Sequence, residues 1–276
     1  MGTGNQVNLL ASLAARQPKR TKMDTVGLLA AMDQEGRSLL RVLPHWSRVR
    51  LGPRQCFSFQ LGNHDCLLLI SGMGRLKAAS AARLLIADAA PQLLISFGTA
   101  GAPQDTLEIG DVISAGQWCA LDEGHLGPIH ALARLSAPAW QSAAQALLQV
   151  SARLLPGTVV TTSGSQQLMD PSGWLPGQVL EMETAGIAQV ANENRIPLLS
   201  LRSVSDNPSY PLPFDLDQVM DQDSRLRIDA MLRMILHHPG LLSGSRRLRV
   251  NTRLACEHAA AAVYAVLKAP GVLQED

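Results

Sequence analysis

Aromatic residues are scarce in this chain, at 4% of its 276 residues. A nucleic-acid-binding protein typically combines a basic stripe with interleaved aromatic side chains. Here 24 basic residues stand against 23 acidic ones, which gives a formal net charge of +1. We therefore expect no nucleic-acid partner.

Cysteine is equally sparse, and no two cysteines form a CxxC pair. The four are Cys56, Cys66, Cys119 and Cys256. This spacing fits neither a disulfide framework nor a zinc site, so we expect free thiols in the reducing cytoplasm and no metal. The longest purely apolar run covers nine residues, Ala259–Leu267, whereas a membrane-spanning helix needs about 20.

Sequence motifs of several large enzyme classes are missing as well. The chain has no GxxxxGK[ST], HExxH or GxSxG motif and no EF-hand loop, which argues against the chemistries that depend on them. Gly72 and Gly74 follow an apolar run, but Lys77 occupies the third glycine position of a dinucleotide-binding loop. We therefore predict no cofactor.

Apolar segments alternate with helical patterns along the chain. The predicted strands are 26–30, 66–70, 93–97, 158–162 and 198–204, and the predicted helices are 35–43, 75–90, 183–194, 216–236 and 241–267. This alternation, with glycine-rich turns between the elements, is typical of an α/β protein. We expect one domain over residues 23–236, a flexible N-terminal extension over 1–22 and a basic helical C-terminal extension over 237–276.

Three acidic residues lie where predicted strands end. Glu35 and Asp206 each follow such a strand and Glu183 opens a predicted helix, and open α/β sheets place their ligand crevice at the carboxyl ends of the strands. Each acid alone has a purely structural explanation, a helix start for Glu35 and Glu183 and a turn for Asp206. Three together indicate a ligand site.

Five sequence blocks carry a family resemblance. They are Gly27-x-x-x-Ala31-Met32-x-x-Glu35, Ser71-Gly72-x-Gly74, Gly98-Thr99-Ala100-Gly101 with Gly110-Asp111-Val112, Glu181-Met182-Glu183, and Arg202-Ser203-Val204-Ser205-Asp206. In this order they resemble the purine nucleoside phosphorylase/uridine phosphorylase superfamily over about residues 25–236. Within it, the chain is most similar to the methylthioadenosine/S-adenosylhomocysteine nucleosidases. The resemblance implies a single domain with a mixed, twisted central sheet flanked by helices.

The resemblance also implies an activity, hydrolysis of the N-glycosidic bond of an adenine nucleoside. By similarity, Asp206 is the general acid that protonates N7 of the departing purine, and Glu35 activates the attacking water on the opposite side of the ribose. Glu183 accepts hydrogen bonds from the ribose hydroxyls. The implied partners are a small nucleoside substrate and a second copy of the chain in a homodimer.

Further site residues follow from the same blocks. Met182 packs against the sugar, Met73 faces the nucleophile side, and the segment Thr99, Ala100 and Gly101 lines the sugar and base site. Ser205 and Arg202 orient Asp206, although a cation near this acid would lower the pKa that a general acid needs to be high. The backbone near Leu168 binds the base, and Phe214 is the mobile apolar residue that follows the acid.

Two differences from the family's sequence pattern concern the nucleophile of the reaction and the base of the substrate. Phosphorylases of this superfamily carry an arginine for phosphate where this chain has Ser96, which favours water over phosphate and leaves a phosphorylase as the alternative. The nucleosidases' Ser-Gly-Asp-x-Phe block is Ser163-Gly164-Ser165-Gln166-Gln167 here. It therefore lacks both the aspartate and the aromatic that stacks on the base, which leaves a non-catalytic nucleoside-binding protein as another alternative.

The C-terminal segment suggests a third alternative. Residues 237–276 extend beyond the small nucleosidases and resemble the hopanoid-associated branch, which removes adenine from adenosylhopane. The basic residues of 241–268 could rest on an anionic membrane surface. Equally, the apolar face of this helix could pack on the body of the protein.

Overall fold

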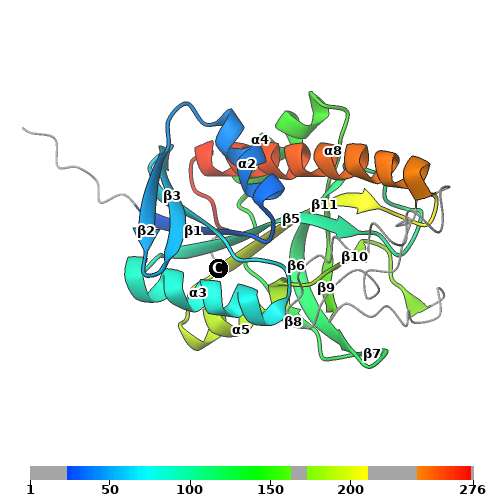
Figure 1. Cartoon of the computed structure of the whole chain (residues 1–276), viewed down its shortest axis with the longest axis horizontal. Coiled ribbons are helices and arrows are strands. Elements are labelled where there is room, and N and C mark those ends of the chain that lie inside the picture. Colours follow the sequence, from blue (N-terminus) through cyan, green and yellow to red (C-terminus); the bar gives the residue numbers. More distant parts are fainter. Residues whose placement is uncertain (1–23, 163–172, 211–240, 275–276) are drawn as a thin grey trace, which may run out of the picture.

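A computed structural model describes residues 24–162, 173–210 and 241–274, and its centre is one large mixed sheet (Figure 1). The strands are β1 (Asp24–Ala30), β2 (Ser47–Leu51), β3 (Arg54–Leu61), β4 (His64–Ile70), β5 (Leu93–Gly101), β6 (Val112–Asp122), β7 (His125–Leu126), β8 (His130–Ala131), β9 (Leu154–Thr162), β10 (Gln178–Glu181) and β11 (Leu198–Asp206). The helices are α2 (Asp33–Val42), α3 (Arg75–Ala89), α4 (Ala137–Leu148), α5 (Thr184–Glu193) and α8 (Leu241–Lys268). The predicted helix 216–236 and the extension 1–22 lie outside the described residues.

The strand order is β10-β9-β6-β11-β5-β1-β4-β3-β2. The pairs β1–β4, β1–β5, β5–β11, β6–β9 and β9–β10 are parallel, while β2–β3, β3–β4 and β6–β11 are antiparallel. The expected mixed α/β sheet is therefore confirmed. Because β10 also pairs with β5, the strands from β5 round to β10 close into a ring that brings the end of β10 beside β5.

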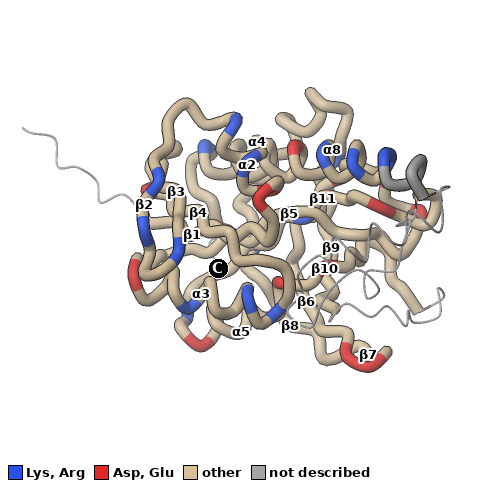
Figure 2. The backbone as a smooth tube through the Cα atoms, in the orientation of Figure 1, with Lys and Arg blue, Asp and Glu red and all other residues tan. Residues whose placement is uncertain are grey.

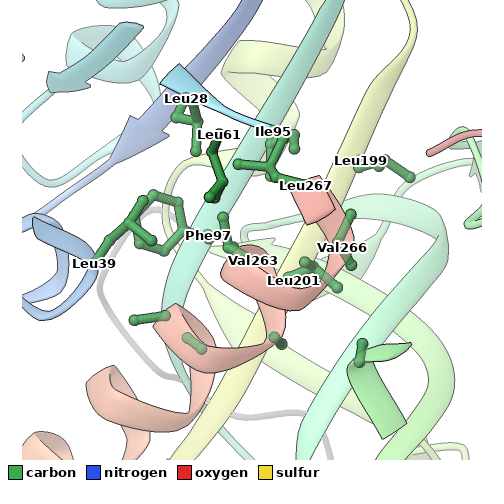
Figure 3. Packing of buried hydrophobic residues seen from close by; sticks show 14 of the residues in the cluster. Leu28, Leu39, Leu61, Ile95, Phe97, Leu199, Leu201, Val263, Val266 and Leu267 are labelled. Carbon is green, nitrogen blue, oxygen red and sulfur yellow. The ribbon is translucent and has the colours of Figure 1, made fainter. Parts of the chain in front are cut away.

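Helices cover both faces of the sheet, with α2, α4 and α8 on one side and α3 and α5 on the other (Figure 1). Each side encloses its own apolar core. Figure 3 shows the first core, in which Leu28 and Phe97 from the sheet meet Val263 from α8. The alanines of α3 allow the second core to pack closely, since Ala78, Ala81 and Ala82 are fully buried.

Helix α8 is more closely joined to the body than an appended extension would be. Its C-terminal half places Ala259, Val263, Val266 and Leu267 in the first core, all fully buried. The apolar face therefore packs on the body, which is one of the two alternatives for this segment. The N-terminal half instead carries exposed arginines, visible as blue segments in Figure 2. Among the described helices, none is long and apolar enough to cross a membrane.

Candidate active site

The carboxyl ends of β5 and β11 lie side by side at the centre of the sheet. The two strands are parallel, with Ser203 opposite Thr99 and Asp206 opposite Gly101. The ring closure adds the end of β10, where Leu180 pairs with Gly101. Residues from four of the five sequence blocks therefore meet at one edge of the sheet. The remaining block, Ser71–Gly74, lies beside them and leads into α3.

Glu35 is buried at the start of α2, with 2% of its surface exposed. Its Oε2 accepts hydrogen bonds from the amides of Ala31 and Met32, both at 2.9 Å, so this oxygen satisfies donors at the beginning of the helix. Its Oε1 accepts from the amide of Thr99 at 2.9 Å and from the Thr99 hydroxyl at 3.3 Å. The structural explanation, a helix start, therefore holds for Oε2, while Oε1 lies against β5.

Burial raises the pKa of Glu35 above its usual range. The hydrogen bond from the Thr99 amide and the charge of Arg202 oppose this shift. Gly98 lets these groups approach, because a Cβ at this position would overlap Oε1 of Glu35 and lie 3.0 Å from Nη1 of Arg202. A glycine is required here for steric reasons.

Arg202 is a fully buried cation on β11, with 1% of its surface exposed. Its Nη2 donates to Ser96 Oγ and Glu181 Oε2, both at 2.7 Å, and to Thr184 Oγ1 at 3.1 Å. Its Nε has no hydrogen-bond partner among the described residues. The expectation that Arg202 orients Asp206 is therefore not met, because its guanidinium is held by Glu181.

Glu181 is a buried carboxylate for which the sequence predicted no role. It accepts hydrogen bonds from the amides of Glu183 and Thr184, the hydroxyls of Thr161 and Thr184, and the Arg202 guanidinium. Glu181 lies two residues before Glu183, which opens a predicted helix. A second acid so close to a helix start is the signal in the sequence that could have drawn attention to Glu181.

Glu183 occupies the N-cap position of α5 but makes no capping hydrogen bond with its side chain. Its Oε1 instead accepts from the backbone amide of Gly74, at the start of α3, at 2.9 Å. Burial, together with the nearby charge of Glu181, raises the pKa of Glu183 from 4.5 to about 8. The simple helix-cap explanation for Glu183 is wrong, since Glu181 satisfies the amides of this helix start.

Asp206 ends β11 and is partly buried. Its Oδ1 accepts a hydrogen bond from the Ser205 hydroxyl at 2.6 Å. A Cβ on Gly101 would lie 2.6 Å from its Oδ2, so the bare backbone of Gly101 leaves room for the carboxyl group. Burial raises the pKa of Asp206, and the Ser205 hydrogen bond opposes that shift. With Arg202 paired elsewhere, the conflict between a cation and a general acid does not arise.

Of the remaining expected site residues, some lie within the described part of the chain and two do not. Met73 lies in the turn between Gly72 and Gly74, and Met182 lies between the two glutamates; both side chains are partly buried. Ala100 is buried on β5 between Thr99 and Gly101. Leu168 and Phe214 lie outside the described residues. In the described ranges, no group of three or more His, Cys, Asp or Glu side chains could hold a metal ion.

Two carboxyl groups, one buried and one partly buried, lie against different positions of β5. Glu35 is anchored at Thr99 and Asp206 lies over Gly101. These positions are two residues apart on β5, which is about 6.6 Å in an extended strand. Groups so arranged can act on a bound molecule from two directions, one as an acid and one as a base.

Two curated proteins similar to this chain share one description. It is 28% identical over 233 residues to the 5'-methylthioadenosine/S-adenosylhomocysteine nucleosidase of Shewanella halifaxensis, covering 76% of this chain and 99% of that protein. The nucleosidase of the same description from Listeria welshimeri is 28% identical over 213 residues, covering 69% of this chain and 91% of the relative.

Solved structures share the fold at lower identity. The nucleosidase from Colwellia psychrerythraea, in complex with adenine, matches with a TM-score of 0.66 and 18% identity, covering 92% of this chain and 99% of that chain. The futalosine hydrolase of Helicobacter pylori gives 0.62 and 18%, covering 88% and 97%. The match to the Colwellia psychrerythraea structure covers 92% of this chain, which is more than residues 1–240 contain, so it includes part of α8.

A family model shows the same relationship over most of the chain. The model of the phosphorylase superfamily matches residues 25–236. This range contains Glu35, Glu183 and Asp206, the acids that meet at the ends of β5, β10 and β11. The chain therefore belongs to the phosphorylase superfamily.

Proposed function

We propose that this protein is a nucleosidase that hydrolyses the N-glycosidic bond of adenine nucleosides of the methylthioadenosine and S-adenosylhomocysteine class. The observation that carries the proposal is the placement of Glu35 and Asp206 against Thr99 and Gly101, with Glu183 beside them. The names of the curated relatives support the same substrate class.

Asp206 has the properties of a general acid for the departing base. Its raised pKa favours the protonated form nearer neutrality, and a protonated carboxyl group can donate to N7 of a purine. The hydrogen bond from Ser205 to Oδ1 fixes one oxygen, so the other, over Gly101, is the one that faces the ligand.

Glu35 has the properties of the group that holds the attacking water. Three of its hydrogen bonds come from backbone amides that cannot move, but the fourth comes from the Thr99 hydroxyl, at the longer distance of 3.3 Å. A hydroxyl rotates freely, so a water can take its place on Oε1. The carboxylate then accepts the proton of the water as it attacks C1 of the sugar.

Glu183 has the properties of a group that binds the ribose of the substrate. With a pKa of about 8 it holds a proton in the free site at neutral pH. The reactive form is the one in which Glu183 has already released its proton to water, because cleavage of a glycosidic bond builds positive charge on the ribosyl ring and a nearby positive charge favours the ionised carboxylate. The ionised form accepts hydrogen bonds from the ribose hydroxyls and stabilises the charge of the transition state.

Water is favoured over phosphate because of the surroundings of Ser96. This side chain is 1% exposed, and its hydroxyl accepts a hydrogen bond from Arg202. The position that carries the phosphate-binding arginine in phosphorylases is thus occupied by a small residue that holds another cation in place. A second copy of the chain in a homodimer remains part of the proposal.

The test is base release from a panel of substrates by the purified protein. Methylthioadenosine, S-adenosylhomocysteine and an adenosylated lipid in detergent are compared, with uridine as the pyrimidine control. We expect adenine from the first two. Release from the lipid alone would replace this substrate class with the hopanoid one, for which the exposed arginines of α8 are the supporting feature. Binding without release from any of them would support the non-catalytic alternative.

A further inference from the structure

We propose that Glu181 is a positioning residue of this site. It accepts hydrogen bonds from the first backbone amides of α5 and from Arg202, and it thereby leaves the Glu183 carboxyl group free for the ligand. The inference rests on the proposed function for its kinetic consequences, but its geometric basis is independent of the substrate.

The hydrogen bonds of Glu181 are unusually complete for a side chain without an assigned role. Its side chain is 1% exposed. Oε1 accepts from Thr161 Oγ1 at 2.5 Å and from the Thr184 amide at 3.1 Å. Oε2 accepts from the Glu183 and Thr184 amides, the Thr184 hydroxyl and Arg202, at 2.7 to 3.0 Å. The two amides and the Arg202 guanidinium can only donate, and the two hydroxyls can donate as well.

The contacts explain why Glu183 does not cap its own helix. An acidic residue at the N-cap position ordinarily accepts hydrogen bonds from the first amides of its helix. Here the Glu183 and Thr184 amides already donate to Glu181. The Glu183 side chain is released from that task and extends to the Gly74 amide on α3 instead. Without Glu181, the first amides of α5 would compete for the Glu183 carboxylate.

Glu181 also determines the direction of the Arg202 guanidinium. Together with Ser96 and Thr184 it accepts from Nη2. The opposite nitrogen, Nη1, is thereby directed toward Gly98, where Oε1 of Glu35 also lies. One buried carboxylate thus determines how both Glu183 and Arg202 are arranged.

The electrostatic effect of Glu181 on Glu183 supplies a readout that a purely structural role would not give. The groups that act on the Glu183 pKa are Glu181 on β10 and Glu35 on α2, which raise it, and Arg202 on β11 and the Gly74 amide on α3, which lower it; burial raises it most. Glu181→Gln removes one of the negative charges at nearly constant volume. The pKa of Glu183 must then fall.

The experiment compares the wild-type protein with Glu181→Gln in both kinetics and thermal unfolding. We expect kcat/KM to fall by about 10²-fold and one limb of its pH profile to move to lower pH by about one unit. Without any substrate, the decrease of the unfolding midpoint as pH rises from 4.5 toward 8 should be smaller in the variant, because Glu183 then ionises closer to its ordinary pKa.

Two controls separate the possible effects. Glu193→Gln removes an exposed carboxylate at the far end of α5 and should leave both readouts unchanged. Thr161→Val removes one donor to Glu181, and with it the acceptor of the Ala185 amide, but keeps the charge of Glu181, so kcat/KM should fall about tenfold while both pH limbs stay in place. This variant also serves if Glu181→Gln does not fold.

The outcomes distinguish the two proposals. If the wild-type protein releases no base, the proposed function fails, and the unfolding measurement still tests the positioning role. If the wild type is active but Glu181→Gln keeps the wild-type pH profile and unfolding curve, the positioning role is wrong. Unchanged kcat/KM in Thr161→Val would overturn it as well.

Discussion

The carboxylate of Glu183 accepts a hydrogen bond from the Gly74 amide at 2.9 Å, although Glu183 stands at the N-cap of a different helix, α5. The bond spans 109 positions of the sequence. It ties the start of α3 to the start of α5 and leaves a buried acid with a raised pKa between them. The candidate site and two helix starts therefore share the same few groups.

Asp206→Asn should reduce base release by at least about 10²-fold while nucleoside binding persists, because an amide cannot donate the proton of a general acid. Ser205→Ala is the companion variant. It removes the hydrogen bond that lowers the pKa of Asp206, so that pKa should rise and one limb of the pH profile should move to higher pH. Steady-state kinetics over the pH range measures both effects, and full turnover in Asp206→Asn would remove Asp206 from the mechanism.

Glu183 should make the folded protein less stable as the solution becomes alkaline. Its pKa is raised in the folded state from 4.5 to about 8, so the folded state holds a proton that the unfolded state releases. The resulting stabilisation is complete below pH 4.5 and is lost as pH rises toward 8. Thermal unfolding between pH 5 and 9 should show this decline, and Glu183→Gln should reduce its slope. Equal slopes in the two proteins would contradict the assigned pKa.

Gly98→Ala should impair catalysis far more than folding. The new methyl group would overlap Oε1 of Glu35 and crowd Nη1 of Arg202, and a displacement of about 1 Å at a catalytic group costs about 10²-fold in rate. Gly116→Ala is the matched control on β6, since its Cβ would meet only the flexible Arg134 side chain, at 3.4 Å. Equal kcat/KM in the two variants would show that the space at residue 98 is not needed.

The role of α8 in the core can be tested by truncating side chains along the helix. Leu267 is fully buried, so Leu267→Ala should lower the free energy of unfolding by about 2–5 kcal/mol. Val250 is 62% exposed on the same helix, and Val250→Ala should change the free energy by less than about 0.5 kcal/mol. Denaturant unfolding measures both values. Similar small losses would mean that the helix does not belong to the core.

Two central strands, β5 and β11, could be predicted from the sequence because they begin with apolar runs and are buried on both faces, whereas β6 beside them was missed. Leu93–Phe97 and Leu198–Val204 fall within β5 and β11, and the glycine turn at Gly72–Gly74 marks the start of α3. The hairpin of β2 and β3 was missed, since its exposed and buried positions alternate irregularly and it carries several polar side chains. Its strands lie at the edge of the sheet, where burial leaves a weaker pattern.

The acids of the site could be predicted, but their partners could not. Glu35 and Asp206 stand directly after strands, which is a local signal. The partners of Arg202 depend on the register of the closed sheet, because Glu181 and Ser96 lie 21 and 106 positions away from it in the sequence. Proximity along the chain suggested Asp206 instead. In an extended strand of nine residues, a side chain four positions away is too distant to contact directly.

The central claim is that water, activated at Glu35, cleaves a nucleoside that is protonated by Asp206. The most direct test is base release from methylthioadenosine in phosphate-free buffer and again with phosphate, with identification of the sugar product. If Glu35 activates water, the rates are equal in both buffers, the product is a free sugar, and activity is lost in Glu35→Gln. Release that requires phosphate and yields a sugar 1-phosphate would contradict it.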